Sequence, residues 1–434
     1  MQSPQINAAT GYLIALDSRD LLIGMYVCEL DCPWSDTPFP LGGFHVKRAE
    51  DIQTLQKFCR HVTIDTNKGA EPARRKRTDL TILSSARRAA PIGATLKVNR
   101  DTYPVTHSIK QILDKSSAAY EALQTQFQAT CIAVREGRTM NLQPLEPLIK
   151  AVVDSLIANP QALIWLLFTD TVARFPSSYC VRAAIWAAML GRQVGLKRND
   201  IEILFLGTLL CDIGMNLLPE RLVNKRGHFR KKEFLAYRKH IEFGLELLSQ
   251  HSQADERILR IVRCHHERHD GRGFPRKIKG DQIPSLARYA NLAYCFERLV
   301  GTNSDKRKFS PAQATSRLYK QRVIKFPEQL VVELIHVLGM YPIGTLVAIN
   351  SGEYALVLDQ NETQRLSPKV ALLTDAARQP LKTPQVVDLA RDDENSNRCI
   401  EHAVSLEQFP IDLSAYRFEF FGKRIGLGPL AIRL

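Results

Sequence analysis

The chain contains one stretch that constrains its fold and chemistry more than any other, Cys264-His265-His266-Glu267-Arg268-His269-Asp270-Gly271-Arg272-Gly273-Phe274-Pro275. Two adjacent histidines end an apolar run, and a carboxylate and a glycine-rich turn closed by proline follow them. Successive helix residues are about 100° apart, so adjacent imidazoles cannot share one helix face. At a helix end, however, they can converge on two metal ions, or on a metal ion and a substrate phosphate. Taken alone, a His-His pair is also compatible with a chance pair on the surface.

Two upstream features strengthen the metal interpretation. Cys211-Asp212 follows the apolar run 203–210, and His240 lies in a segment of helical spacing. From about residue 170 to 320 the chain resembles the HD-GYP family, a branch of the HD superfamily of metal-dependent phosphohydrolases that hydrolyses cyclic di-GMP. The family signature is matched by His265, His266, Glu267, Asp270, Gly271, Gly273 and Pro275, with Phe274 at the position of the name-giving tyrosine. Residues 279–288 fit the family pattern as well.

The fold class that we expect is mainly α. An HD-type helical bundle over 169–338 is preceded by a small α+β module over 1–70, a linker over 71–107 and connecting helices over 108–168. Apolar residues at three- to four-residue steps predict the helices. After residue 339 the period changes to two, which predicts a small β appendage with three strands within 345–373, and a C-terminal tail completes 339–434.

The N-terminal module resembles the uncharacterised domain that often precedes HD-GYP domains. Its pattern is matched by Gly24, Met25, Val27, Leu30, Asp31, Pro33, Trp34, Pro38, Phe39, Gly43 and Phe44. Within the module we predict a helix over 49–59 and a strand over 61–65. The resemblance says nothing about a ligand for this module, and we expect Trp34 and Phe44 to pack in its core.

Composition narrows the class of protein. No run of about 18 apolar residues occurs, and the N-terminus lacks the basic start and apolar core of a signal peptide, so we expect a cytoplasmic protein without membrane insertion. Nine scattered cysteines indicate reduced thiols rather than a disulfide framework. The net charge of +14 favours an anionic partner. Basic clusters such as Arg74–Arg77 carry no interleaved aromatic residues, which argues against nucleic acid.

The resemblance implies a set of metal ligands, of which four are intact. The aspartate of the HD pair corresponds to Asp212, and a later helix histidine corresponds to His240. The paired histidines correspond to His265 and His266. A divalent metal such as Fe, Mn or Zn is therefore the expected cofactor, and Asp212 is also the candidate catalytic residue.

Four other positions depart from the family pattern. Tyr179 stands in place of an early histidine, and Cys211 in place of the histidine of the HD pair. Met215 replaces the lysine that contacts the substrate phosphate in the family. Tyr294 replaces the last aspartate ligand, and Glu297, three residues further on, is a candidate substitute because it lies on nearly the same helix face.

These departures weaken the expected chemistry. The tyrosine pKa is about 10, so a phenol is a poor ligand for Mg, Mn or Fe(II) at neutral pH. Loss of the lysine removes a charge that would stabilise the transition state. Cys211 could still bind a softer metal as a thiolate, which together with the four intact residues would make a mononuclear site. The alternative is that the surviving histidines and Asp212 are hydrogen-bonded core residues.

Two functions follow from the resemblance. The first is a catalytically weak or inactive regulator that binds cyclic di-GMP or a diguanylate-cyclase (GGDEF) domain. The second is an active cyclic di-GMP phosphodiesterase with a reduced metal site. For contact with a partner or ligand we select the loop of Asp270, Gly271, Arg272, Gly273, Phe274, Pro275, Arg276 and Lys279. The sequence leaves a homodimer open.

Overall fold

The computed structural model describes residues 13–31, 37, 39, 43–66, 69–70, 98–169, 175, 177–225, 228–250, 255–303, 306–307, 309, 311–339, 341–361, 364, 366–391 and 398–404. Several sequence-based expectations lie outside these residues. They are the placement of Trp34, the cluster Arg74–Arg77, most of the linker over 71–107, and the tail after residue 404.

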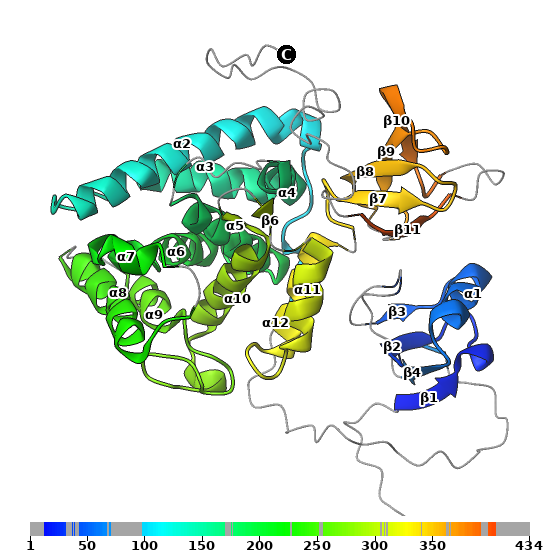
Figure 1. The fold of residues 1–434 in the computed structure, drawn as a ribbon, viewed down its shortest axis with the longest axis horizontal. Coiled ribbons are helices and arrows are strands. Elements are labelled where there is room, and N and C mark those ends of the chain that lie inside the picture. The colour runs from blue at the N-terminus through cyan, green and yellow to red at the C-terminus, as the bar shows by residue number, and fades with distance from the viewer. Residues whose placement is uncertain are drawn as a thin grey trace, which may run out of the picture.

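The N-terminal module is a four-stranded antiparallel sheet with one helix (Figure 1). Its strands are β1 (Leu13–Asp17), β2 (Tyr26–Leu30), β3 (Phe44–His45) and β4 (His61–Asp65), in the order β1-β4-β2-β3. Helix α1 (Ala49–Phe58) packs its apolar side on this sheet through Leu55. The predicted helix and the predicted strand over 61–65 are therefore confirmed. Phe44 packs against this core, as expected.

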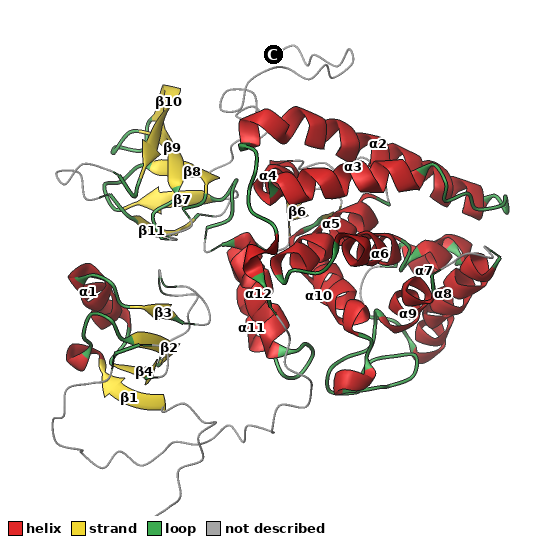
Figure 2. Ribbon diagram, turned by 180° about the vertical axis from the view of Figure 1, so that it is seen from behind, coloured by secondary structure: helices red, strands yellow, loops and turns green. Residues whose placement is uncertain are grey.

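The central part of the chain is helical, as Figure 2 shows. Its helices are α2 (Ile109–Arg135), α3 (Leu145–Ala158), α4 (Pro160–Thr169), α5 (Ser178–Gln193), α6 (Arg198–Leu209), α7 (Glu220–Val223), α8 (Lys231–Ser249), α9 (Glu256–Cys264), α10 (Ser285–Val300), α11 (Pro311–Lys320) and α12 (Glu328–Leu338). Helix α5 is buried on every side and packs between α6 and α10. The expected mainly helical fold of this region is confirmed.

The C-terminal appendage is larger than the three strands expected from the sequence. It is a five-stranded antiparallel sheet in the order β10-β9-β8-β7-β11. Strands β7 (Leu346–Ile349), β8 (Tyr354–Asp359) and β9 (Lys369–Thr374) were predicted, but β10 (Pro380–Asp388) and β11 (Ile400–Ala403) were not. The side chains of β10 are mostly exposed or half-buried, so that strand lacks the apolar alternation by which a strand is recognised.

The sheet is joined to the helices by its alternating side chains. Leu346, Leu356 and Leu373 belong to the same buried core as the helices. Their neighbours Val347 and Leu372 face a second core on the opposite side of the sheet. This two-sided burial explains why β7 to β9 are nearly continuous apolar runs.

No single helix in the described ranges combines the length and the apolar composition needed to cross a bilayer. Helix α3 and residues 160–168 of α4 meet the criterion only together, and the pair bends by 109°.

The buried carboxylate of Glu333 on α12 binds Arg100, which lies in the segment before α2. Glu333 accepts hydrogen bonds from Arg100 at 2.6 Å and from Gln193 at 3.2 Å. Burial by itself would raise the pKa of Glu333, but interactions with His336, Arg100 and Gln193 lower it to about 2. Because the folded pKa lies below the unfolded value, the carboxylate stabilises the fold above about pH 4.5, and this stabilisation is lost as the pH falls towards 2.

We therefore expect Glu333→Gln to cost about 1–2 kcal/mol of unfolding free energy near pH 7, with a smaller cost near pH 3.5. This figure is below the full value of the pKa shift because the Arg100 side chain is about half exposed to solvent. Urea unfolding of the wild type and the variant at both pH values measures the difference. A cost that is the same at both pH values would contradict this assignment.

Candidate metal centre

Four side chains from separate segments converge in the helical domain. Asp212 lies between α6 and the 3₁₀ turn η4 (Ile213–Leu217), His240 lies on α8, and His265 and His266 follow α9. One potential ligand atom from each residue lies within 4.8 Å of the others. Helix α9 ends at Cys264, which lets two adjacent imidazoles turn to the same point, with ring centroids 4.1 Å apart. The structure brings together all four of the ligands expected to be intact.

Gly214 is required for this convergence. A Cβ atom at this position would collide with the carbonyl oxygen of His240 and with the backbone nitrogen of Gly244. Glycine therefore allows η4 to approach α8 closely, and this contact holds Asp212 beside His240.

The inward-facing atoms of the cluster suit a metal ion. Asp212 Oδ1 and the Nε2 atoms of His240, His265 and His266 are buried and have no hydrogen-bond partner. The other ring nitrogen of His240 donates to Tyr237 O at 2.6 Å, and that of His265 donates to Val262 O at 2.8 Å. A histidine whose Nδ1–H binds a carbonyl presents a bare Nε2 lone pair, which is the usual arrangement of a metal-binding histidine. The residues present therefore fit a divalent cation.

The electrostatics of the cluster agree with this conclusion for two of the three imidazoles. Burial would lower the pKa of His265, but Cys211 and Asp212 hold it well above its usual value, so a metal ion would have to displace a proton from that ring. Burial lowers the pKa of His240, and burial together with His265 lowers that of His266, so both rings are neutral ligands near neutral pH. Burial would raise the pKa of Asp212, but His265 and His240 hold it well below its usual range. Asp212 therefore contributes a carboxylate. Three imidazoles and one carboxylate suit Zn or Fe(II) better than Mg.

Two tyrosines border the cluster at positions where the family resemblance led us to expect ligands. The Tyr179 hydroxyl donates to Asp212 Oδ2 at 2.9 Å. The Tyr294 ring lies beside His265 and His266, with centroid distances of 6.0 and 5.7 Å. Burial and the charge of Asp212 raise the pKa of both phenols well above the usual value, so both stay protonated and are poor ligands.

The other two substituted positions differ in their surroundings. Cys211 is buried, its thiol lies 3.3 Å from Gly207 O, and it is not among the four residues whose ligand atoms converge. Its role as a ligand stays a prediction. Met215 is half-buried on η4 and brings no charge.

The selected loop is organised by Glu267 and covers the cluster. The buried Glu267 side chain accepts hydrogen bonds from the backbone N–H groups of Arg276 at 2.7 Å and Lys277 at 3.0 Å. Phe274 is half-buried because its ring stacks on His266 at 4.5 Å between centroids. Phe274 thus packs against the candidate metal centre, and its expected contact with a partner stays a prediction.

The remaining loop residues have the following places. Asp270 pairs with Arg268 at 2.6 Å and accepts the N–H of Arg272. Gly271 has φ +76°, which favours glycine. A Cβ on Gly273 would collide with the backbone of 266–268. Pro275 follows a cis peptide bond. Arg272, Arg276 and Lys279 are exposed and free to meet an anionic surface.

The structure corrects the suggestion that Glu297 substitutes for the missing aspartate. Glu297 points away from the cluster, where it accepts from Arg182 Nε at 2.6 Å and from Trp186 Nε1 at 2.8 Å. All three side chains are buried. The i, i+3 spacing placed Glu297 near the face of Tyr294, but the adjacent helix α5 supplies a stronger partner.

Sequence reasoning missed two residues that border the cluster. The Tyr237 ring lies 4.9 Å from that of His240. Arg298 places its guanidinium over the Tyr294 ring, 5.8 Å from the centroid. Arg298 could have been noticed because it lies one helical turn after Tyr294.

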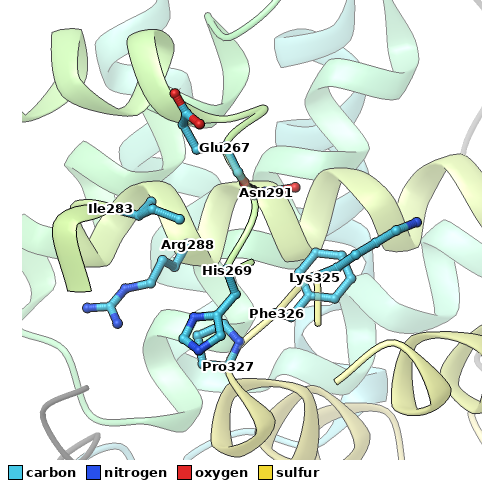
Figure 3. A pocket seen from close by; sticks show the side chains of 8 residues that line it. All are labelled: Glu267, His269, Ile283, Arg288, Asn291, Lys325, Phe326 and Pro327. Carbon is cyan, nitrogen blue, oxygen red and sulfur yellow. Dashed lines mark hydrogen bonds between the residues drawn. The ribbon is translucent and has the colours of Figure 1, made fainter. Parts of the chain in front are cut away.

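A small cavity beside Glu267 has none of the four cluster residues in its lining (Figure 3). Its lining consists of Glu267, His269, Ile283, Arg288, Asn291, Lys325, Phe326 and Pro327. The space holds no more than about one water molecule, so it is too small to bind a nucleotide.

Two family models match the chain. The HD domain model matches residues 146–326, and a domain of unknown function, DUF3391, matches residues 13–145. The domain boundaries that we expected from the sequence stay predictions.

The similar proteins of known function are phosphodiesterases. Cyclic di-GMP phosphodiesterase PA4108 of Pseudomonas aeruginosa is 27% identical, over 86% of this chain and 87% of that protein. The 3'3'-cGAMP-specific phosphodiesterase 2 of Vibrio cholerae is 27% identical over 38% of this chain and 31% of that protein. A solved structure, the HDG"Y"P protein Bd1817 of Bdellovibrio bacteriovorus, is 17% identical with a TM-score of 0.43, covering 75% of this chain and 99% of that one. The chain thus combines a match to the HD domain family with a preceding match to DUF3391, and over most of its length it is similar to a cyclic di-GMP phosphodiesterase.

Proposed function

We propose that this protein binds a single divalent metal ion and cyclic di-GMP, and acts in the cytoplasm as a regulator with little or no phosphodiesterase turnover. The observation that carries the proposal is the hydrogen bond from Tyr179 to Asp212 Oδ2. Asp212 is the only carboxylate among the four converging residues. Because Oδ2 accepts the Tyr179 hydrogen bond, Oδ1 is the oxygen that remains to bind a metal ion.

A two-metal mechanism needs ligands for two cations about 3.5–4 Å apart. The convergent atoms of Asp212, His240, His265 and His266 surround one point, and the adjacent Tyr179 and Tyr294 are protonated phenols. This arrangement supports one cation and provides no carboxylate for a second.

When bound, the metal would supply Lewis-acid polarisation of a phosphate oxygen. The residues of this chain would orient it, because the backbone carbonyls of Tyr237 and Val262 fix the imidazoles of His240 and His265. Phe274 shields one face of His266 from water. The uncharged Met215 adds nothing to neutralise a pentacoordinate phosphate, which favours binding over turnover.

The partner that we propose is a GGDEF-type signalling domain. Arg272, Arg276 and Lys279 project from a loop whose backbone is fixed by the buried Glu267. A fixed basic loop complements an acidic protein surface and increases the rate of encounter.

Equilibrium dialysis with labelled cyclic di-GMP tests the proposed function. We expect the metal-loaded wild type to bind the nucleotide, and we expect the nucleotide to be recovered chemically unchanged. The variant Asp212→Asn should lose the part of the binding that depends on metal. The proposal fails if the metal-loaded protein binds no cyclic di-GMP.

A second candidate function is hydrolysis of cyclic di-GMP with one metal. The convergence of an intact set of three imidazoles and one carboxylate favours it, because one metal can polarise a phosphate and activate water. Linear formation of the opened dinucleotide during dialysis would select this candidate.

A further inference from the structure

We propose that Arg298 binds a phosphate group of the nucleotide ligand, at the exposed side of the metal centre. The inference rests on the proposed function, because it assigns the ligand's phosphate to a residue beside that same centre. Arg298 lies on α10, one turn after Tyr294, whose buried ring is in edge contact with both His265 and His266.

The position of the guanidinium suits this role. It lies over the Tyr294 ring at 5.8 Å from the centroid, while the side chain as a whole remains exposed. A cation–π contact holds the group, and the hydroxyls of Tyr294 and Tyr237 interact with it as well. The guanidinium carries five N–H donors, so donors of the exposed Arg298 remain for an incoming anion besides those that face the two phenols.

Arg298 is not occupied by an acidic partner. Within the described part of the chain it forms no ion pair with a carboxylate, whereas Arg268 pairs with Asp270 and Arg182 on α5 pairs with Glu297.

Arg238, which lies against Phe274, is less suited to the same task. It donates to Pro275 O at 3.1 Å, and its guanidinium lies against Phe274 at 5.4 Å, so it mainly fixes the loop. Met215 has no charge to offer. Arg298 is thus the cation beside the cluster best placed for a phosphate, and a guanidinium can bind two phosphate oxygens at once.

The test compares Arg298→Gln and Arg298→Lys with the wild type, all loaded with zinc. Arg260→Gln is the matched control, because Arg260 is an exposed helix arginine paired with Glu256. Isothermal titration calorimetry measures binding of two probes, cyclic di-GMP and inorganic pyrophosphate. Bound zinc and far-UV circular dichroism are measured for each variant.

We expect Arg298→Gln to raise the Kd for both probes about tenfold or more, with unchanged zinc content and helicity. Arg298→Lys should have an intermediate affinity, because the charge remains but the two-point contact of the guanidinium is lost, and Arg260→Gln should retain the wild-type affinity. The affinity of Arg298→Gln should also depend less on salt than that of the wild type.

The outcomes separate this inference from the proposed function. If Arg298→Gln binds both probes as tightly as the wild type, the phosphate role is wrong while the proposed function stands. If the wild type binds pyrophosphate through Arg298 but no cyclic di-GMP, the proposed function is wrong and the phosphate site stands. Absence of both kinds of binding in the wild type would overturn both.

Discussion

Replacing His265 with alanine is expected to lower the affinity of the protein for a divalent metal by more than about 100-fold. The side chain is fully buried, its Nε2 faces Asp212 Oδ1 at 3.5 Å, and its other nitrogen is fixed by Val262 O. Alanine removes one of the four converging ligands. Metal content after anaerobic reconstitution and desalting, measured by mass spectrometry, gives the result.

Two companion variants make this experiment decisive. Asp212→Asn keeps the shape of the side chain and removes the charge, so it should lose metal without a change in packing. His402→Ala removes an exposed histidine on β11 and should bind metal like the wild type. Wild-type metal content in both His265→Ala and Asp212→Asn would show that the cluster is a hydrogen-bonded core and not a metal site.

Replacing Glu297 with alanine is expected to destabilise the helical domain by about 3–5 kcal/mol. Glu297 joins α10 to α5 through Arg182 and Trp186, and the Arg182 side chain is only 8% exposed. Without the carboxylate, Arg182 would keep a buried charge that water cannot reach. Urea unfolding followed by tryptophan fluorescence reports this loss, because Trp186 donates directly to Glu297.

The double variant Arg182→Met/Glu297→Leu is the control for this effect. Removing both charges leaves no uncompensated ion, so the double variant should be markedly more stable than Glu297→Ala. If the single and the double variants are equally unstable, the loss comes from packing rather than from the buried charge.

The fold was largely predictable from periodicity. The apolar spacing of α3 and α8 gave their bounds, because each helix buries one face and ends at a polar break or a proline. Strands β10 and β11 were missed because β10 exposes much of its length and β11 has only four residues. The short turn η4 was also missed, since its formation depends on the close approach of Gly214 to α8.

The candidate site was predictable only in part. The motif around His265 and His266 identified the cluster, and the structure brings Asp212 and His240 to it. The partners of Tyr179 and Glu297 could not be predicted from the sequence, because each contact joins segments that are far apart in the sequence. Arg298 belongs to no motif that we recognised, and only its position over Tyr294 gives it a role.

The most direct test of the account is a turnover assay. Cyclic di-GMP is incubated with anaerobically purified protein supplemented in turn with Mn and Fe(II), products are separated by chromatography, and an active family member is run in parallel. The account predicts that nucleotide binds but no opened product accumulates, because Tyr179 and Tyr294 stand where further metal ligands would be needed. Linear product formation by the wild type that His265→Ala abolishes would contradict it, and would establish a one-metal phosphodiesterase instead.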